Sequence, residues 1–168
     1  IVPFTRGRER SRNLESILEE SKNAVNLGYS EITLLGQNVN SYNYQNLKFH
    51  NLLEEVSKIK NLKRIRYTSP HPQDITKELL SVMAEFDNIC NYIHLPIQSG
   101  NSRVLKLMNR TYDQAWYKER VESIYRIIPD CAISSDMIAG FCTETEEEHQ
   151  ETVDMVYWAK YSMSYMFY

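Results

Sequence analysis

The chain has 168 residues, of which 42% are hydrophobic and 24% are charged, and this composition fits one soluble globular domain. Its net charge of −3 gives no overall basic field of the kind that many nucleic-acid-binding proteins carry. No apolar run approaches the ~18 residues of a membrane span, and no signal peptide opens the chain, so we expect a cytoplasmic protein without a membrane partner.

The charges are unevenly distributed along the chain. Residues 1–126 carry 18 Lys and Arg against 14 Asp and Glu, whereas residues 127–168 carry 1 against 8. The basic excess peaks near the start, at Arg6, Arg8, Arg10 and Arg12. Such a cluster could bind phosphate or another anionic group, or it could be a solvated basic loop that leads into a helix.

Three cysteines, Cys90, Cys131 and Cys142, lack C-x-x-C spacing, and their odd number argues against a disulfide framework and a self-contained zinc site. We expect Cys90 and Cys131 to be small buried side chains, because each stands at the entry to an apolar, strand-like run. The chain opens on Ile1 without a methionine, which indicates a segment of a longer protein.

Helix-like and strand-like segments alternate along the chain. A helical stripe from about residue 14 ends at Gly28, and a strand follows over 31–35. Further helices are predicted over about 49–59, 75–86, 104–108, 111–128 and 143–160, and further strands around 65–67 and over 92–95, 131–138 and 163–168. The last two helices are predicted to begin at capping boxes, Thr111 with Gln114 and Thr143 with Glu146.

This alternation predicts an α/β fold with a parallel sheet. The chain has no G-x-G-x-x-G for a dinucleotide-binding fold and no G-x-x-x-x-G-K-[ST] for a P-loop. Polar residues instead follow the strands, at 36–38, 69–72, 98–100 and 136–140. Polar groups at successive strand C-ends are typical of a barrel with its site at one end. We therefore predict a partial (β/α) barrel in which Gln37, Gln98 and Asp136 meet at one face.

Two ionisable residues interrupt apolar, strand-like runs. Asp136 lies within 131–138, and a carboxylate there has to be paired or has to face a polar barrel interior. His94 lies in a shorter apolar strand, where we expect a core histidine with satisfied hydrogen bonds. The Gly-Gln-Asn stretch at 36–38 offers close backbone approach and amide groups, although turn formation explains it equally well.

Four stretches in the right order and spacing resemble the methylthiotransferase family of radical S-adenosylmethionine enzymes, across essentially the whole chain. They are IVPFTRGRERSR at 1–12, LLGQNVNSY at 34–42, HLPIQSG at 94–100 followed by VLKLMNR at 104–110, and SDMIAGF at 135–141 followed by TETEE at 143–147. The stretch GQNVNSY at 36–42 looks most like the branch of the family that acts on tRNA.

The resemblance implies an enzyme core with a partial radical S-adenosylmethionine barrel. In this family a [4Fe-4S] cluster reductively cleaves S-adenosylmethionine, the resulting radical abstracts hydrogen, and sulfur and a methyl group are installed. For the tRNA branch the substrate is N6-isopentenyladenosine beside the anticodon, and the partners are tRNA and an electron donor. Another modified tRNA adenosine or a ribosomal protein is the alternative substrate. From other classes, a non-catalytic RNA-binding module and an unrelated barrel enzyme such as an aldolase stay open.

The resemblance also implies that residues 1–168 form an incomplete core domain. The family's three cluster cysteines fall just before the position of Ile1, and the first barrel strand, the N-terminal domain and the C-terminal RNA-binding domain lie outside the chain. We therefore expect the chain alone to be inactive and to hold neither metal nor cofactor stably. We also expect it to self-associate through an unpaired strand edge.

Nine residues take cofactor-binding roles by this resemblance. Gly36, Gln37 and Asn38 correspond to the strand end near the methionine amino group, Gln98 and Ser99 to the strand near the ribose, and Asp136 and Gly140 to the adenosine side. Arg110 or Arg8 would supply a cation for the methionyl carboxylate. No catalytic residue and no metal ligand is expected in the chain.

Overall fold

The computed structural model describes residues 10–68 and 71–168. Within them, five strands lie in one parallel series: β1 (Glu31–Leu34), β4 (Arg64–Tyr67), β5 (Tyr92–His94), β6 (Ala132–Ile138) and β7 (Met163–Phe167). Strand β1 pairs with β4, and β5 pairs with β6, which pairs with β7, always in parallel. A parallel bridge between Ile65 and Ile89 links β4 to the segment that enters β5.

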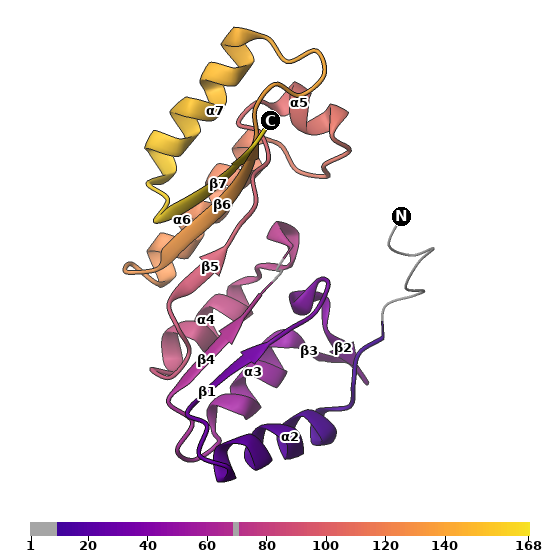
Figure 1. Ribbon diagram of the computed structural model, residues 1–168, viewed down its shortest axis with the longest axis vertical. Helices are drawn as coiled ribbons and strands as arrows, with labels where there is room; N and C mark the ends of the chain where they lie inside the picture. Colours follow the sequence, from indigo (N-terminus) through magenta and orange to yellow (C-terminus); the bar gives the residue numbers. More distant parts are fainter. Residues whose placement is uncertain (1–9, 69–70) are drawn as a thin grey trace.

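The strands therefore lie side by side in chain order, without the reversal that marks a doubly wound sheet. Figure 1 shows them as one curved array that does not close on itself, with β1 near the bottom and β7 near the top. An open, curved series of parallel strands alternating with helices is part of a (β/α) barrel. The predicted fold class is confirmed.

Six helices lie within the described residues; the first precedes β1, and the other five lie between strands. They are α2 (Leu14–Asn26), α3 (Phe49–Ser57), α4 (Lys77–Glu85), α5 (Ser102–Leu107), α6 (Gln114–Ile127) and α7 (Glu146–Ala159). Two 3-10 turns, η1 (Val39–Ser41) and η2 (Pro72–Asp74), follow β1 and β4. Helices α3, α4 and α6 lie behind the strands in Figure 1, where they cover one face of the sheet. In the part of the chain that the structure describes, no helix is long and apolar enough to cross a membrane.

The hydrophobic core lies between the sheet and these helices. Alternate strand residues point into it, such as Ile65, Ile93 and Ile133, and each of these is fully buried. The helices contribute side chains at helical spacing, among them Leu53 of α3 and Leu80 of α4. One face of every inner strand is thereby apolar and covered.

The opposite face of the sheet lies toward the viewer in Figure 1, and it carries polar side chains on β1, β4, β5 and β6. Glu31 of β1 accepts hydrogen bonds there from Arg64 (2.5 Å) and Arg66 (3.1 Å) of β4. His94 and Asp136 occupy the same face on β5 and β6. A complete barrel usually fills its interior with bulky apolar side chains, so this polar lining indicates a face that contacts solvent or a ligand.

Both predicted capping boxes begin two residues too early. Helix α6 is capped by Asp113, whose carboxylate accepts from the backbone N–H of Trp116 at 2.8 Å. Helix α7 is capped by Thr145 in a capping box with Glu148. Thr111 and Thr143 were plausible caps by spacing alone, but the carboxylate of Asp113 is a stronger acceptor, and Thr143 is bound by a residue of another helix.

A short hairpin was not predicted. Strands β2 (Asn43–Tyr44) and β3 (Leu47–Lys48) pair antiparallel through a two-residue turn at Gln45 and Asn46. Both turn residues have a positive φ, 49° and 69°. A two-residue hairpin turn usually contains glycine. Because glycine is absent here, the sequence lacks the usual signal for a hairpin.

The two outer strands, β1 and β7, each have one edge that pairs with no other strand among the described residues. Strand β7 is exposed along its whole length, and the side chains of Met166 and Phe167 are 66% and 56% exposed.

An exposed apolar edge pairs readily with another chain, so we expect the 168-residue chain to self-associate. Light scattering over a concentration series should show a mass that rises with concentration, and Phe167→Lys should lower it. A monomer at every concentration would contradict the expectation.

Candidate functional site

The five strands of this series run in parallel, so the segments that follow them all leave the sheet at its carboxyl end. Gln98 lies directly beside Asp136: its N–H donates to the Asp136 carbonyl at 2.8 Å, and its own carbonyl accepts from the N–H of Ile138 at 2.9 Å. Gln37 is three residues beyond the end of β1. The predicted meeting of Gln37, Gln98 and Asp136 at one end of the sheet agrees with these strand directions.

A histidine–carboxylate pair stands at the centre of the open face. His94 Nε2 lies 3.3 Å from Asp136 Oδ2, and its Nδ1 lies 2.8 Å from Ser134 Oγ. Tyr92 bonds the same serine hydroxyl at 2.6 Å, and the ring of Tyr165 meets the His94 ring edge-on at 6.2 Å. This cluster offers hydrogen-bond donors, acceptors and aromatic surface to a ligand on the open face.

The expectation of a core histidine at 94 is wrong in one respect. Its hydrogen bonds are satisfied, but 22% of its side chain and 26% of that of Asp136 remain exposed. The strand places His94 on the open face, because its neighbours Ile93 and Leu95 point into the core. Asp136 was predicted either to be paired or to face a polar barrel interior. Both hold, because its carboxylate is hydrogen-bonded to His94 and lies on the open face.

Gln98 has a strained backbone, with a left-handed φ of 71°. Such a conformation costs a non-glycine residue on the order of 1–3 kcal/mol and is found disproportionately at ligand sites. The partly exposed side-chain amide makes no hydrogen bond to any described residue. Gln98 therefore has a fixed backbone and an amide that is available to a ligand.

Ser99 does not reach the open face. It is fully buried, and its hydroxyl lies 3.4 Å from Thr152 Oγ1 and accepts from the N–H of Asn101. The next residue, Gly100, donates its N–H to Thr152 Oγ1 at 2.8 Å. The side chain of Ser99 thus holds the loop against α7, and the cofactor contact that the resemblance assigned to it is not supported by this placement.

The loop after β1 holds its neighbour, the loop after β4. Asn38 Nδ2 donates to Asp74 Oδ2 at 2.7 Å, and Asn38 Oδ1 accepts from the N–H of His71 at 3.3 Å. Both polar atoms of the Asn38 side chain are therefore engaged within the protein. The side chain of Gln37 is exposed and makes no such bond among the described residues, so of these two amides only Gln37 is available to a ligand.

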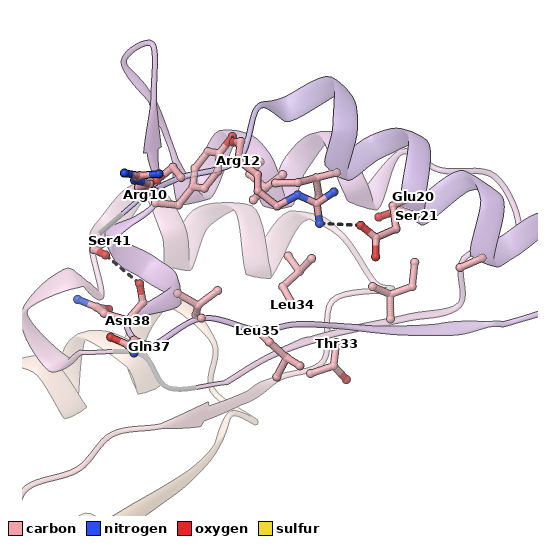
Figure 2. Close-up of a pocket in the computed structure, with 18 residues that line it drawn as sticks. Arg10, Arg12, Glu20, Ser21, Thr33, Leu34, Leu35, Gln37, Asn38 and Ser41 are labelled. Carbon is pink, nitrogen blue, oxygen red and sulfur yellow. Dashed lines mark hydrogen bonds and ion pairs between the residues drawn. The ribbon is translucent and has the colours of Figure 1, made fainter. Parts of the chain in front are cut away.

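A groove of about 870 Å³ runs along the free edge of β1, between that strand and α2. In Figure 2, Leu34 and Leu35 lie on its strand side, Arg12 pairs with Glu20 on its helix side, and Gln37 and Asn38 lie at one end. Gln98 and Asp136 do not line this groove. The large groove therefore reaches only the first of the strand ends and is distinct from the His94–Asp136 cluster.

Arg110 and Gly140 complete the predicted set. Arg110 is partly buried, its Nε atom has no partner, and among the described residues it forms no ion pair. Gly140 adopts a left-handed φ of 72°, and its N–H donates to Glu144 Oε2 at 2.7 Å. Arg8 lies outside the described residues.

The three cysteines are far from forming one metal site. Cys131 is buried, Cys90 is half-buried and Cys142 is exposed, so the expectation of a buried thiol is confirmed only for Cys131. Burial raises the pKa of the Cys131 thiol to about 12. In the described parts of the chain, no three His, Cys, Asp or Glu side chains come together in a way that could hold a metal ion.

Sequence reasoning missed the side chains that surround His94. Ser134 could have been found, because it stands two residues from Asp136 on a strand and must share its face. Tyr165 could not, because its place opposite Asp136 depends on the register between β6 and β7.

The family model of the radical SAM superfamily matches residues 1–156. The chain belongs to this superfamily. Fold similarity agrees: a radical S-adenosylmethionine methyltransferase, TsrM, from Kitasatospora setae superimposes with a TM-score of 0.71 over 96% of this chain and 31% of its own, at 16% identity. The cobalamin-dependent S-adenosylmethionine radical enzyme OxsB gives a TM-score of 0.62 over 86% of this chain and 22% of its own, at 11% identity.

Curated relatives in the superfamily are much more similar in sequence. The tRNA-2-methylthio-N(6)-dimethylallyladenosine synthase of Amoebophilus asiaticus is 53% identical over the whole of this chain, and that of Phocaeicola vulgatus is 51% identical over 99% of it. A synthase of the same name from Porphyromonas gingivalis is 50% identical. The chain spans about 38% of the length of the first two relatives.

Proposed function

We propose that this chain is the central core of a longer tRNA methylthiotransferase, which adds a 2-methylthio group to N6-isopentenyladenosine next to the anticodon. The observation that carries the proposal is about 50% identity, over essentially the whole chain, to synthases named for this product. The polar open face at the strand C-ends supports it, because a barrel enzyme places its ligands there. The partners are then tRNA and an electron donor, and the compartment is the cytoplasm.

The chain's own residues would hold S-adenosylmethionine. Arg110 has an unpaired guanidinium suited to the methionyl carboxylate. The free amides of Gln37 and Gln98 would bond the amino group and the ribose. Asp136, whose carbonyl accepts from the Gln98 N–H, and Gly140, four residues after it, would take the adenosine side. When a [4Fe-4S] cluster is bound, it supplies the electron that cleaves S-adenosylmethionine into a hydrogen-abstracting radical. The cysteines of this chain do not fit that cluster, and the resemblance to the family implies that its ligands precede Ile1.

Replacing Gln98 by alanine in the longer protein should weaken S-adenosylmethionine binding by about tenfold, since a lost hydrogen bond to a ligand costs about 1–1.5 kcal/mol. Calorimetry on the reconstituted protein measures the affinity, and mass spectrometry of digested tRNA measures the 2-methylthio product. Gln150→Ala is the matched control, because Gln150 is an exposed residue of α7 that bonds only Asp154.

The Gln150→Ala control should leave both the affinity for S-adenosylmethionine and the amount of 2-methylthio product unchanged. An unaltered affinity in Gln98→Ala would remove Gln98 from the site. If the unsubstituted protein forms no 2-methylthio-N6-isopentenyladenosine in tRNA, the proposed reaction is removed. A 2-methylthio group on another modified tRNA adenosine, or a modified ribosomal protein, would then identify the alternative substrate.

A further inference from the structure

We propose that Arg103 is a positioning residue that fixes the shape of the loop after β6 and ties it to the loop after β5. The inference rests on the proposed function, because these two loops carry Gln98 and Gly140. Arg103 itself touches none of the residues assigned to the cofactor. It acts through Thr143 and Glu148.

The guanidinium of Arg103 makes four hydrogen bonds across the gap between α5 and the start of α7. Its Nε and Nη2 donate to the two carboxylate oxygens of Glu148 at 2.5 and 2.6 Å. Nη2 also donates to the Thr143 carbonyl at 2.7 Å, and Nη1 to the Thr143 hydroxyl at 3.3 Å. The Arg103 hydrogen bond is the largest cause that lowers the pKa of Glu148, to about 2. Such a planar, forked contact fixes orientation as well as distance.

The loop that Arg103 holds is strained. Thr143 has a φ of 70°, a conformation that a β-branched residue adopts only when its surroundings impose it. Gly140, three residues earlier, is also left-handed. Glu144, the residue after Thr143, folds back, and its carboxylate accepts from the N–H groups of Gly140 and Phe141 at 2.7 and 3.3 Å. The course of the chain just after Asp136 therefore depends on Thr143 staying where Arg103 holds it.

The same segment also fixes the loop after β5. Asn101 caps α5 with its side-chain oxygen, and its Nδ2 donates to Glu151 Oε1 at 2.8 Å. Gln114 Nε2 donates to the Gly100 carbonyl at 2.6 Å and approaches Glu151 Oε2 at 3.3 Å. Arg103 follows two residues after Asn101. One short stretch, 100–103, is thus bound to the first two turns of α7 and holds both ligand-facing loops in one geometry.

The test compares Arg103→Gln and Thr143→Gly, singly and together, in the longer protein. If Arg103 acts by keeping Thr143 left-handed, Arg103→Gln should weaken S-adenosylmethionine binding by about tenfold, as the loss of a supporting contact does at other sites. Glycine adopts the left-handed conformation without strain, so in the Thr143→Gly protein the same substitution should cost only about twofold. Lys58→Gln is the matched control: Lys58, which caps the C-terminus of α3, makes exposed ion pairs with Glu54 and Glu55, and its side chain is 49% exposed against 48% for Arg103.

A second reading does not depend on the cofactor. Hydrogen exchange of the Gly140 and Phe141 amides, measured without added ligand, should quicken about tenfold in Arg103→Gln and stay unchanged in Lys58→Gln. Equal losses of affinity with and without Thr143→Gly would overturn the proposal, because Arg103 would then contact the ligand directly. Faster exchange spread evenly over β5 and β6 would also overturn it and mark a role in stability alone. If the unsubstituted protein binds no S-adenosylmethionine, the proposed function fails and the exchange data alone decide the role of Arg103.

Discussion

Replacing Gly100 by alanine should destabilise the fold by about 3 kcal/mol, at the upper end of what overpacking usually costs. A Cβ atom at this position would lie 2.5 Å from the Glu151 carbonyl oxygen and 2.6 Å from the Thr152 Cα. Both are backbone atoms of a helix, which cannot move aside as a flexible side chain can. Urea unfolding followed by circular dichroism measures the change.

Gly28→Ala is the control for this substitution. A Cβ atom there meets nothing within 4 Å, but the backbone has a φ of 97° that only glycine adopts easily. Gly28→Ala should lower the free energy of unfolding by about 1–2 kcal/mol, and this loss should come from backbone strain alone. If the two substitutions destabilise equally, the close approach between Gly100 and α7 is not the reason for glycine at 100.

The 168-residue chain, treated with iron and sulfide under reducing conditions, should bind no [4Fe-4S] cluster. Cys131 precedes β6 and Cys142 follows it, and a seven-residue strand separates its ends by about 20 Å. Cys90 stands before β5, near the same end of the sheet as Cys131. Three thiolates therefore cannot converge on one cluster, and the raised pKa of Cys131 also keeps that thiol protonated.

Iron analysis and the visible absorption of the reconstituted sample measure this result. The longer protein with Cys90, Cys131 and Cys142 all changed to serine should still bind its cluster, which serves as the positive control. Stoichiometric iron in the 168-residue chain would show that these cysteines are ligands after all, and would contradict the placement of the cluster before Ile1.

The order and type of the main elements follow from the sequence by itself. Strand-like runs at 31–35, 92–95 and 131–138 and helical stripes between them predicted the parallel series that the structure contains. They could be read because burial of one face imposes a period of two on strands and 3.6 on helices. Asp136 was also found this way, since a carboxylate inside an apolar strand needs a partner wherever the chain folds.

Tertiary structure alone decided which polar residues are available to a ligand. Ser99 and Gln98 are adjacent polar residues. The Ser99 hydroxyl is hydrogen-bonded to Thr152 of α7, which is far away in the sequence, whereas the Gln98 amide forms no hydrogen bond within the described chain. The side chain of Asn38 is likewise already hydrogen-bonded, to Asp74. The partners of Arg103, Thr143 and Glu148, are 40 and 45 residues away in the sequence, and α7 is capped by Thr145 and not by the predicted Thr143. Hydrogen bonds between segments far apart in the chain leave no periodic trace in the sequence, so only the folded arrangement shows which donors and acceptors are already used.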